Sequence, residues 1–345
     1  MQRPCVPPPL PHAPPLSALL RQYAAGRAVT CEPVDQGLLN RGYRLRTTRG
    51  RYFLKHHFDP ETADPAAIAR QHRATRRLSD LGVPVAPPLS GRDGGTVAVV
   101  GGHAYALHPW IDGGHRHGGQ LTPAQCGRLG GLLGAVHAGL ERVMPRRVMP
   151  PRGRAPAVSA DPEDTFALIE ELLGRVGRHR PVDAFDELAR HRLLERRVLL
   201  ERHAGRRPSG GGPVGWVHGD FHPFNLLYRG DAPAAIVDWD RLGVQPRAEE
   251  AVRAAAIFFV RPAGTLDLPK VRAYARAYRS AAGADAAELA AAVHRVWWER
   301  LNDFWMLRWR YERGDSRADP QFPAASALVV WWTREYDAVR AAFVD

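Results

Sequence analysis

The chain has 345 residues, 45% of them hydrophobic, and a formal net charge of +12. This length exceeds that of a usual single core, so we expect two lobes. We find no apolar run of the roughly 20 residues that span a bilayer and no apolar core of a secretory signal at the start, and we therefore expect a cytoplasmic protein without a membrane partner. The basic residues are scattered and form no stripe, which argues against a nucleic-acid partner.

The first part of the chain has the pattern of an antiparallel sheet. Residues 1–15 contain seven prolines, and we predict a disordered tail there, because proline removes backbone donors. A short helix at 17–25 and a longer one from Asp64-Pro65 to about residue 79 flank strand-like runs separated by turns. We place an N-terminal lobe at 16–107, with strands at 29–34, 42–47, 51–56, 96–100 and 103–107.

From residue 108 onward the pattern is helical, and we assign 108–345 to a second lobe. The apolar residues recur with the three-to-four-residue spacing of amphipathic helices. We predict helices at 122–140, 162–176, 184–203, 247–260, 270–282 and 286–312. In the last of these, tryptophan and leucine recur every fourth residue, which favours a buried stripe: Trp297, Leu301, Trp305 and Trp309.

A polar loop between short apolar strands carries the candidate chemistry. It runs WVHGDFHPFNLLY over 216–228 and is followed by AIVDWD over 235–240. Asp220 and Asn225 are five residues apart, as are the Asp and Asn of a kinase catalytic loop. Asp238 ends an apolar strand, and its carboxylate can bind Mg²⁺ together with the Asn225 amide oxygen. This pattern predicts transfer of a phosphoryl group, with Asp220 as the base.

The N-terminal lobe supplies residues that could hold nucleotide phosphates. Asn40 and Gly42 lie in a glycine-containing turn whose backbone amides could cover phosphates. Lys55 ends an apolar strand, as does the phosphate-binding lysine of kinases. Of the 48 basic residues, only Lys55 and Lys270 are lysines. A lysine retained among so many arginines indicates a site that needs a compact ammonium charge.

These motifs make the chain resemble the aminoglycoside phosphotransferase and choline kinase-like family of small-molecule kinases, over about residues 17–310. The resemblance rests on HGDFHPFNLL and IVDWD, and Gly219 stands where protein kinases have arginine. It implies a bilobal α+β fold of the protein-kinase type, with an antiparallel N-terminal sheet and a larger helical lobe, and transfer of the γ-phosphoryl group of ATP. It also implies the following roles: Asp220 as catalytic base, Asn225 and Asp238 as Mg²⁺ ligands, His218 as a support of the loop, and His108 or Trp110 as the donor to adenine.

Gln71 departs from the kinase pattern. Kinases pair the phosphate-binding lysine with a glutamate on the following helix, but this position holds Gln71, on a face shared with Ile68, Thr75 and Leu78. Glutamine can accept a bond from an ammonium group without neutralising its charge. The sequence therefore leaves open a second interpretation, a catalytically impaired pseudokinase that binds a nucleotide or a metabolite.

For the acceptor, the sequence predicts a class of molecule and a set of candidate contacts. We expect a small molecule with a hydroxyl group, and its candidate contacts are Asp240, Glu299 and Asp303. A net positive chain makes a polycationic aminoglycoside less natural. Homoserine, amino alcohols, sugars and macrolides all remain open, and so does the oligomeric state.

Overall fold

The computed structural model describes residues 14–34, 40–58, 63–144, 159–209 and 212–345. The predicted tail therefore lies outside the described residues, apart from its last two. Contacts within the chain divide it into two compact units, Met1–Gly113 with Ala234–Asp240, and Gly114–Pro233 with Arg241–Asp345. The segment of seven residues from the second half thus belongs to the first unit, although it lies far along the chain.

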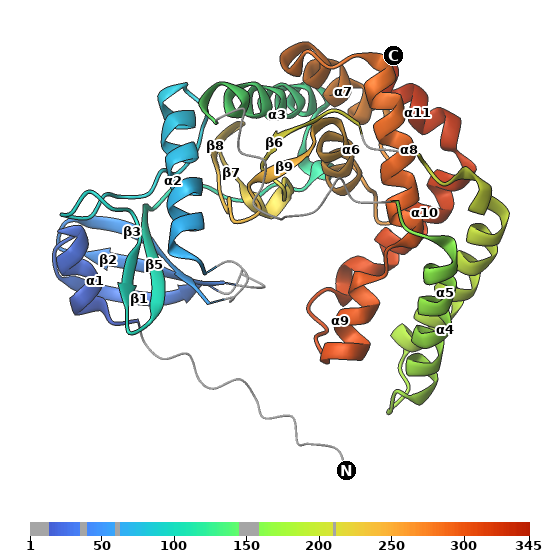
Figure 1. Ribbon diagram of the computed structural model, residues 1–345, viewed down its shortest axis with the longest axis horizontal. Coiled ribbons are helices and arrows are strands. Elements are labelled where there is room, and N and C mark those ends of the chain that lie inside the picture. The colour runs from blue at the N-terminus through green and yellow to red at the C-terminus, as the bar shows by residue number, and fades with distance from the viewer. Residues whose placement is uncertain (1–13, 35–39, 59–62, 145–158, 210–211) are drawn as a thin grey trace. The chain divides into compact units, whose positions relative to one another are not determined.

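The first unit is built on a five-stranded antiparallel sheet with the strand order β1-β2-β3-β5-β4 (Figure 1). This confirms the predicted sheet, although β5 extends two residues further than expected. The helix α2 begins at a proline after Asp64, whose carboxylate accepts the N–H groups of Ala66 and Ala67. The elements are α1 (Leu16–Tyr23), β1 (Ala28–Val34), β2 (Arg41–Thr47), β3 (Gly50–His57), α2 (Pro65–Asp80), β4 (Ala98–Val100) and β5 (His103–Pro109).

The two faces of this sheet are different. The α1 side is apolar, and its buried residues include Leu20, Tyr43, Leu54 and Leu107. Successive side chains along a strand point to opposite faces of the sheet. Because Leu54 points to the α1 side, Lys55 and His57 point to the other face. The first unit therefore has a conventional core on one side and a polar set of side chains on the other.

The second unit is mainly helical. It contains the antiparallel pair β6–β9, and the helices α3 and α7 pack against each other, as do α6 and α8. Strand β8 (Ala232–Ile236) begins in the second unit and ends in the first. The other elements are α3 (Pro123–Val143), α4 (Pro162–Arg178), α5 (Ala184–His203), β6 (Val214–Val217), β7 (Leu226–Arg229), β9 (Gly243–Pro246), α6 (Arg247–Phe258), α7 (Leu268–Ala282), α8 (Ala286–Asn302), α9 (Trp305–Arg313), α10 (Phe322–Arg334) and α11 (Tyr336–Val344).

The long helix predicted at 286–312 is wrong, because the structure has two helices there. Asp303 is extended, with φ −99° and ψ 131°, and its carboxylate accepts the N–H of Trp305 at 3.0 Å. This side-chain bond offers the backbone an alternative to the helical ladder. The break resets the register, so Trp297 is buried whereas Trp305 is 36% exposed. The predicted aromatic stripe is therefore buried only in its first half.

No element was predicted after residue 312, whereas the structure has α10 and α11 there. Within the described ranges, none of the helices is both long and apolar enough to cross a membrane.

Candidate active site

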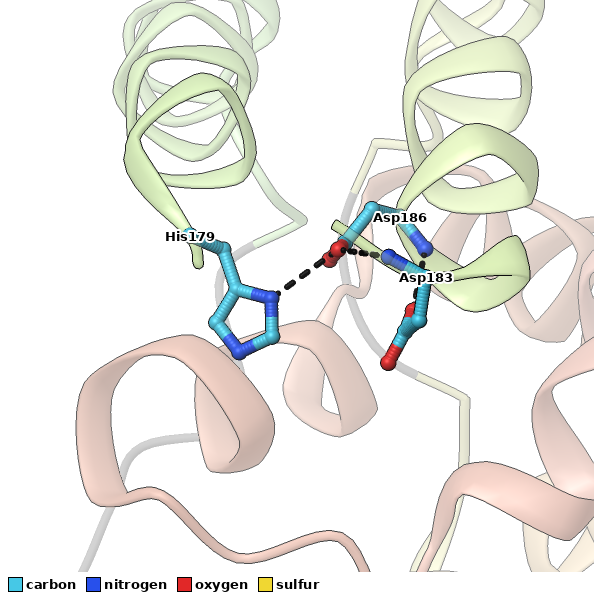
Figure 2. Close-up of side chains that lie close together, drawn as sticks. All are labelled: His179, Asp183 and Asp186. Carbon is cyan, nitrogen blue, oxygen red and sulfur yellow. Dashed lines mark hydrogen bonds and ion pairs between the residues drawn. The ribbon is translucent and has the colours of Figure 1, made fainter. Parts of the chain in front are cut away.

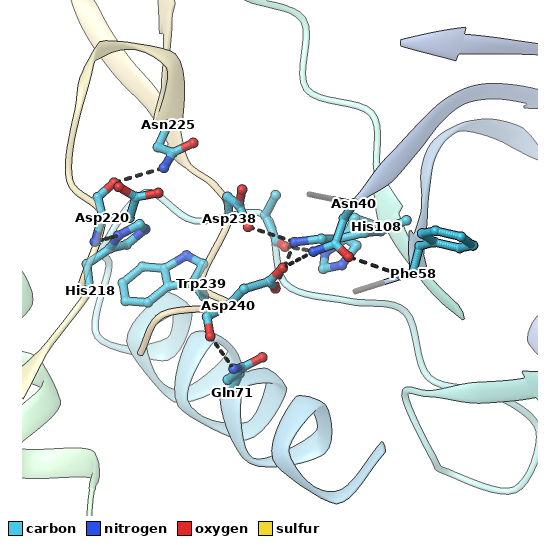
Figure 3. Close-up of polar contacts among 12 residues, drawn as sticks. Asn40, Phe58, Gln71, His108, His218, Asp220, Asn225, Asp238, Trp239 and Asp240 are labelled. Carbon is cyan, nitrogen blue, oxygen red and sulfur yellow. Dashed lines mark hydrogen bonds and ion pairs between the residues drawn. The ribbon is translucent and has the colours of Figure 1, made fainter. Parts of the chain in front are cut away.

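Lys55 lies among polar side chains of the first unit, and Figure 3 labels three of these residues, Asn40, Asp238 and Asp240. Its Nζ is 2.7 Å from Oδ1 of Asp238 and 2.7 Å from Oδ1 of Asp240. Burial by itself would lower the pKa of the Lys55 ammonium, but the two carboxylates outweigh it, and the pKa is raised. The ammonium therefore stays charged and is held in one place.

Asp240 is held by two further residues of the first unit, Asn40 and Gln71. Its Oδ2 accepts a hydrogen bond from Nδ2 of Asn40, and its carbonyl oxygen accepts Nε2–H of Gln71 at 2.9 Å. Asn40 in turn accepts the N–H of Phe58 at 3.1 Å. Burial, opposed by Lys55, raises the pKa of the Asp240 carboxyl. The structure thus brings Asp240, predicted at the acceptor, together with Asn40 and Lys55, both predicted at the nucleotide, and with Gln71 of α2.

Asp238 has an unusual backbone. Its φ of 60° lies in the left-handed region, which non-glycine residues seldom adopt, and strain of this kind clusters at functional sites. The segment is tied to the first unit, because Ile236 donates its N–H to the carbonyl of Pro84 at 2.8 Å. The Asp238 side chain is 47% exposed, so its carboxylate can reach a ligand.

Of the other residues predicted to bind the nucleotide, Gly42 and His108 lie on the same sheet, and Trp110 directly follows its strand β5. Gly42 is paired with Lys55 across β2 and β3, while residues 35–39 of the predicted phosphate turn lie outside the described residues. His108 lies in β5, and its ring contacts the carbonyl of Ala86 at 2.9 Å. The N–H of Trp110 donates to the carbonyl of Arg51 at 3.1 Å. This bond extends the β3–β5 pairing, so a bond from Trp110 to adenine would have to replace it.

Asp220 lies in the loop between β6 and the short helix Pro223–Asn225 of the second unit. Nδ2 of Asn225 donates to the carbonyl of Asp220 at 2.8 Å, and the N–H of Asp220 donates to Nδ1 of His218 at 3.2 Å. Both neighbours hold the backbone of Asp220, which leaves its carboxylate 36% exposed. Burial raises the pKa of this carboxyl, but His222 and Arg241 outweigh it, and the pKa is lowered. Asp220 is therefore an ionised and oriented carboxylate.

Gly219 is required by the shape of this loop. Its φ is 87°, and a Cβ on it would lie 2.2 Å from the carbonyl oxygen of Arg241. An arginine, as in protein kinases, does not fit here.

A buried carboxylate that was not predicted from the sequence holds the loop. Glu250 of α6 accepts the N–H of His218 at 3.2 Å and the N–H of Gly219. It also contacts Nε2 of His137 at 2.7 Å, and Nδ1 of His137 contacts the hydroxyl of Tyr278 at 3.0 Å. Burial would raise the pKa of Glu250, but the bond and charge of His137 outweigh it, and the pKa is lowered. His137 is fully buried and part of this network.

The three predicted acceptor residues do not form one group within either unit. Asp240 belongs to the first unit, whereas Glu299 and Asp303 belong to the second. Glu299 is paired with Arg253 at 2.7 Å, and Asp303 caps the start of α9.

A further cluster, His179, Asp183 and Asp186, has ligand atoms within 4.8 Å of one another (Figure 2). The carboxylate oxygens of Asp186 already accept hydrogen bonds from other groups of the protein. Asp186 accepts His179 Nδ1–H at 2.9 Å, the N–H of Asp183 at 2.9 Å and the hydroxyl of Tyr311 at 2.7 Å. Asp183 and Asp186 form the capping box of α5. This cluster therefore stabilises a helix end and does not resemble a metal centre.

Hard oxygen donors are what Mg²⁺ prefers, and the predicted ligands offer them. Asp238 has an accessible carboxylate, and because Asn225 uses Nδ2 to hold Asp220, its oxygen is the atom left for a ligand. Each of these two residues, taken by itself, thus carries an oxygen donor of the kind that suits the ion implied by the kinase resemblance.

Comparisons with known proteins agree with this reading of the fold. A model of the phosphotransferase enzyme family matches residues 30–284. A homoserine kinase of Acidiphilium cryptum (strain JF-5) is 26% identical over 275 residues, which cover 79% of this chain and 78% of that protein. A spectinomycin phosphotransferase solved with ADP and spectinomycin has a TM-score of 0.65 at 14% identity, and the matched part covers 93% of this chain and 97% of that chain. A microcompartment-associated aminopropanol kinase has a TM-score of 0.59 at 17% identity, with coverage of 95% and 99%.

Proposed function

This chain belongs to the phosphotransferase enzyme family and is a kinase that acts on a hydroxyl group, and we propose that it transfers the γ-phosphoryl group of ATP to the hydroxyl of a small amino acid of the homoserine type. The observation that carries the proposal is the pairing of Lys55 with the Asp238 and Asp240 carboxylates. A kinase needs this ammonium in a fixed position for the nucleotide phosphates. Because the reaction consumes ATP, we infer that it takes place in the cytoplasm.

In the proposal, four residues act on the nucleotide or on the acceptor. Lys55 binds the α- and β-phosphates, and Asn225 and Asp238 would hold Mg²⁺, which would neutralise charge on the phosphates. Asp220 orients the acceptor hydroxyl and takes its proton. The acceptor oxygen then forms a bond to the γ-phosphorus, the bond from that phosphorus to the bridging oxygen breaks, and ADP leaves.

The lowered pKa of Asp220 fits this chemistry. A weakly basic carboxylate is a good orienting group but removes a proton only late in the reaction. Phosphoryl transfer through a loose transition state needs little deprotonation of the attacking oxygen at an early stage. Positioning by the loop, and not basicity, should therefore supply most of the contribution of Asp220.

Two observations support an amino-acid acceptor. The homoserine kinase relative matches over most of both chains. In addition, the chain carries a net charge of +12, which attracts a substrate with a carboxylate more readily than a polycation. The aminopropanol kinase, which shares the fold, makes an amino alcohol the second candidate, and it differs from homoserine by lacking the carboxylate.

The test is ADP release by the purified protein with Mg-ATP and a panel of acceptors. The panel contains homoserine, homoserine methyl ester, aminopropanol and spectinomycin. We expect homoserine to give the highest kcat/KM, and the ester, which lacks the negative charge, to lose much of it. Stimulation by spectinomycin or aminopropanol but not by homoserine would overturn the acceptor assignment.

A further inference from the structure

The usual carboxylate partner of the phosphate-binding lysine is absent from α2. Gln71 occupies the position on the inward face, next to the buried Ile68 and Thr75. Its Nε2–H group donates to the main-chain carbonyl of Asp240 at 2.9 Å. The helix side chain thus binds the backbone of the residue whose carboxylate holds Lys55.

Of the two carboxylates on Lys55, that of Asp240 is the buried one. The Lys55 and Asp240 side chains are 11% and 12% exposed, whereas that of Asp238 is 47% exposed. As a ligand of Mg²⁺ in the proposed function, Asp238 would share its negative charge with the ion and would attract the Lys55 ammonium less strongly. Asp240 is further fixed by Asn40, so its carboxylate has one orientation.

We propose that Asp240 positions Lys55 in place of a helix glutamate, and that Gln71 acts on Lys55 through Asp240. This inference deepens the proposed function and rests on it, because it assigns the geometry of the nucleotide phosphates to Asp240. It removes Asp240 from the acceptor contacts. Gln71 is then a residue that positions Asp240, and its presence does not indicate a catalytically impaired kinase.

The chemistry of position 71 explains why an amide suits it. The Asp240 carbonyl is an acceptor and needs a donor, which an ionised glutamate lacks. A carboxylate at this position would face that carbonyl oxygen and add a second negative charge close to the Asp240 carboxylate. A glutamate at position 71, normal in other kinases, should therefore damage this one.

The experiment compares Gln71→Glu and Asp240→Asn with the wild type, and uses Gln22→Glu, an exposed position in the same unit, as the matched control for charge. The first readout is the Kd of Mg-ATP with no acceptor present. We expect both site variants to weaken binding about tenfold, the equivalent of one charged hydrogen bond, and the control to leave it unchanged. Wild-type or tighter ATP binding by Gln71→Glu would overturn the proposal.

The second readout needs neither nucleotide nor turnover. The chain has only two lysines, and their side chains are similarly buried, with Lys55 11% and Lys270 14% exposed. An amine-reactive reagent, with the products mapped by mass spectrometry, should label Lys55 faster relative to Lys270 in both site variants of the apo-protein. Unchanged relative labelling in Asp240→Asn would contradict the positioning role. Failure of the kinase proposal itself would look different, since wild-type protein would then release no ADP with any acceptor.

Discussion

The ring of His137 and the carboxylate of Glu250 lie 2.7 Å apart in the interior of the second unit. Both side chains are almost inaccessible to solvent, with exposed fractions of 0% and 5%. The same carboxylate accepts the backbone N–H groups of His218 and Gly219. The loop that carries Asp220 is therefore attached to the helical core through one buried acid.

Glu250→Gln should destabilise the protein by about 3–5 kcal/mol, the usual cost of breaking a buried pair. The glutamine keeps one acceptor oxygen but turns an NH₂ group toward N–H donors. Urea unfolding measures the loss, and kcat should fall with it, because the loop is no longer held in one position. Glu170→Gln is the control, since its exposed pair with Arg197 should contribute less than about 1 kcal/mol. Equal losses in the two variants would contradict the anchoring role.

Gly219→Ala should lower both stability and kcat. The new Cβ would lie 2.2 Å from the carbonyl of Arg241, in a backbone with φ 87°, and we expect a cost above about 2 kcal/mol. Gly283→Ala separates the two causes, because Gly283 also has a positive φ of 67° but has nothing within 4 Å of its added Cβ. Thermal unfolding should show a clearly larger loss for Gly219→Ala. A similar loss at both positions would mean that the close approach to Arg241 is unimportant.

His57 should make the first unit sensitive to acid. It is 2% exposed, and neither ring nitrogen has a hydrogen-bond partner among the described residues. Burial, together with the charge of Lys55, lowers its pKa from 6.5 to about 3. Between these two values the unfolded chain binds the proton and the folded protein does not, so stability falls as the pH drops below 6.5. For one such histidine, the free energy of unfolding changes by up to about 1.4 kcal/mol per pH unit.

The variant His57→Leu tests this pH dependence. Its free energy of unfolding should fall less between pH 7 and pH 5 than that of the wild type, when both are measured in urea. His191→Asn, at an exposed position of α5, should keep the wild-type slope. If His57→Leu also kept it, the buried neutral histidine would not be the cause.

Much of the fold and the loop could be predicted because the signals are local. Strand alternation and turns located the five strands of the first sheet, and the spacing of Asp220 and Asn225 lies within a single loop. The break at Asp303 was missed because the apolar spacing continues across it, while the competing bond from its carboxylate to the N–H of Trp305 leaves no periodic signal.

Contacts between distant segments could not be predicted in the same way. Asp240 was expected at the acceptor, yet it contacts Lys55 and Gln71, 185 and 169 positions away, and only folding brings these residues together. The sequence carries a weak signal for Glu250, which shares a helical face with the buried Ala254 and Phe258. A charged residue on an apolar face must find buried partners, and here these are His137 and the backbone of the loop.

In the proposed reaction, Asp220 directs the γ-phosphoryl group of ATP to the hydroxyl of homoserine. The most direct measurement is ³¹P NMR of the products formed from ATP and homoserine by the wild type and by Asp220→Asn, with Asp337→Asn, an exposed position, as the control. We predict a phosphate monoester signal with the wild type and the control, and a rate lower by about 10²–10⁴-fold with Asp220→Asn, while its Kd for Mg-ATP stays near that of the wild type. A phosphate monoester formed at the wild-type rate by Asp220→Asn, or free phosphate as the only product of the wild type, would contradict the account.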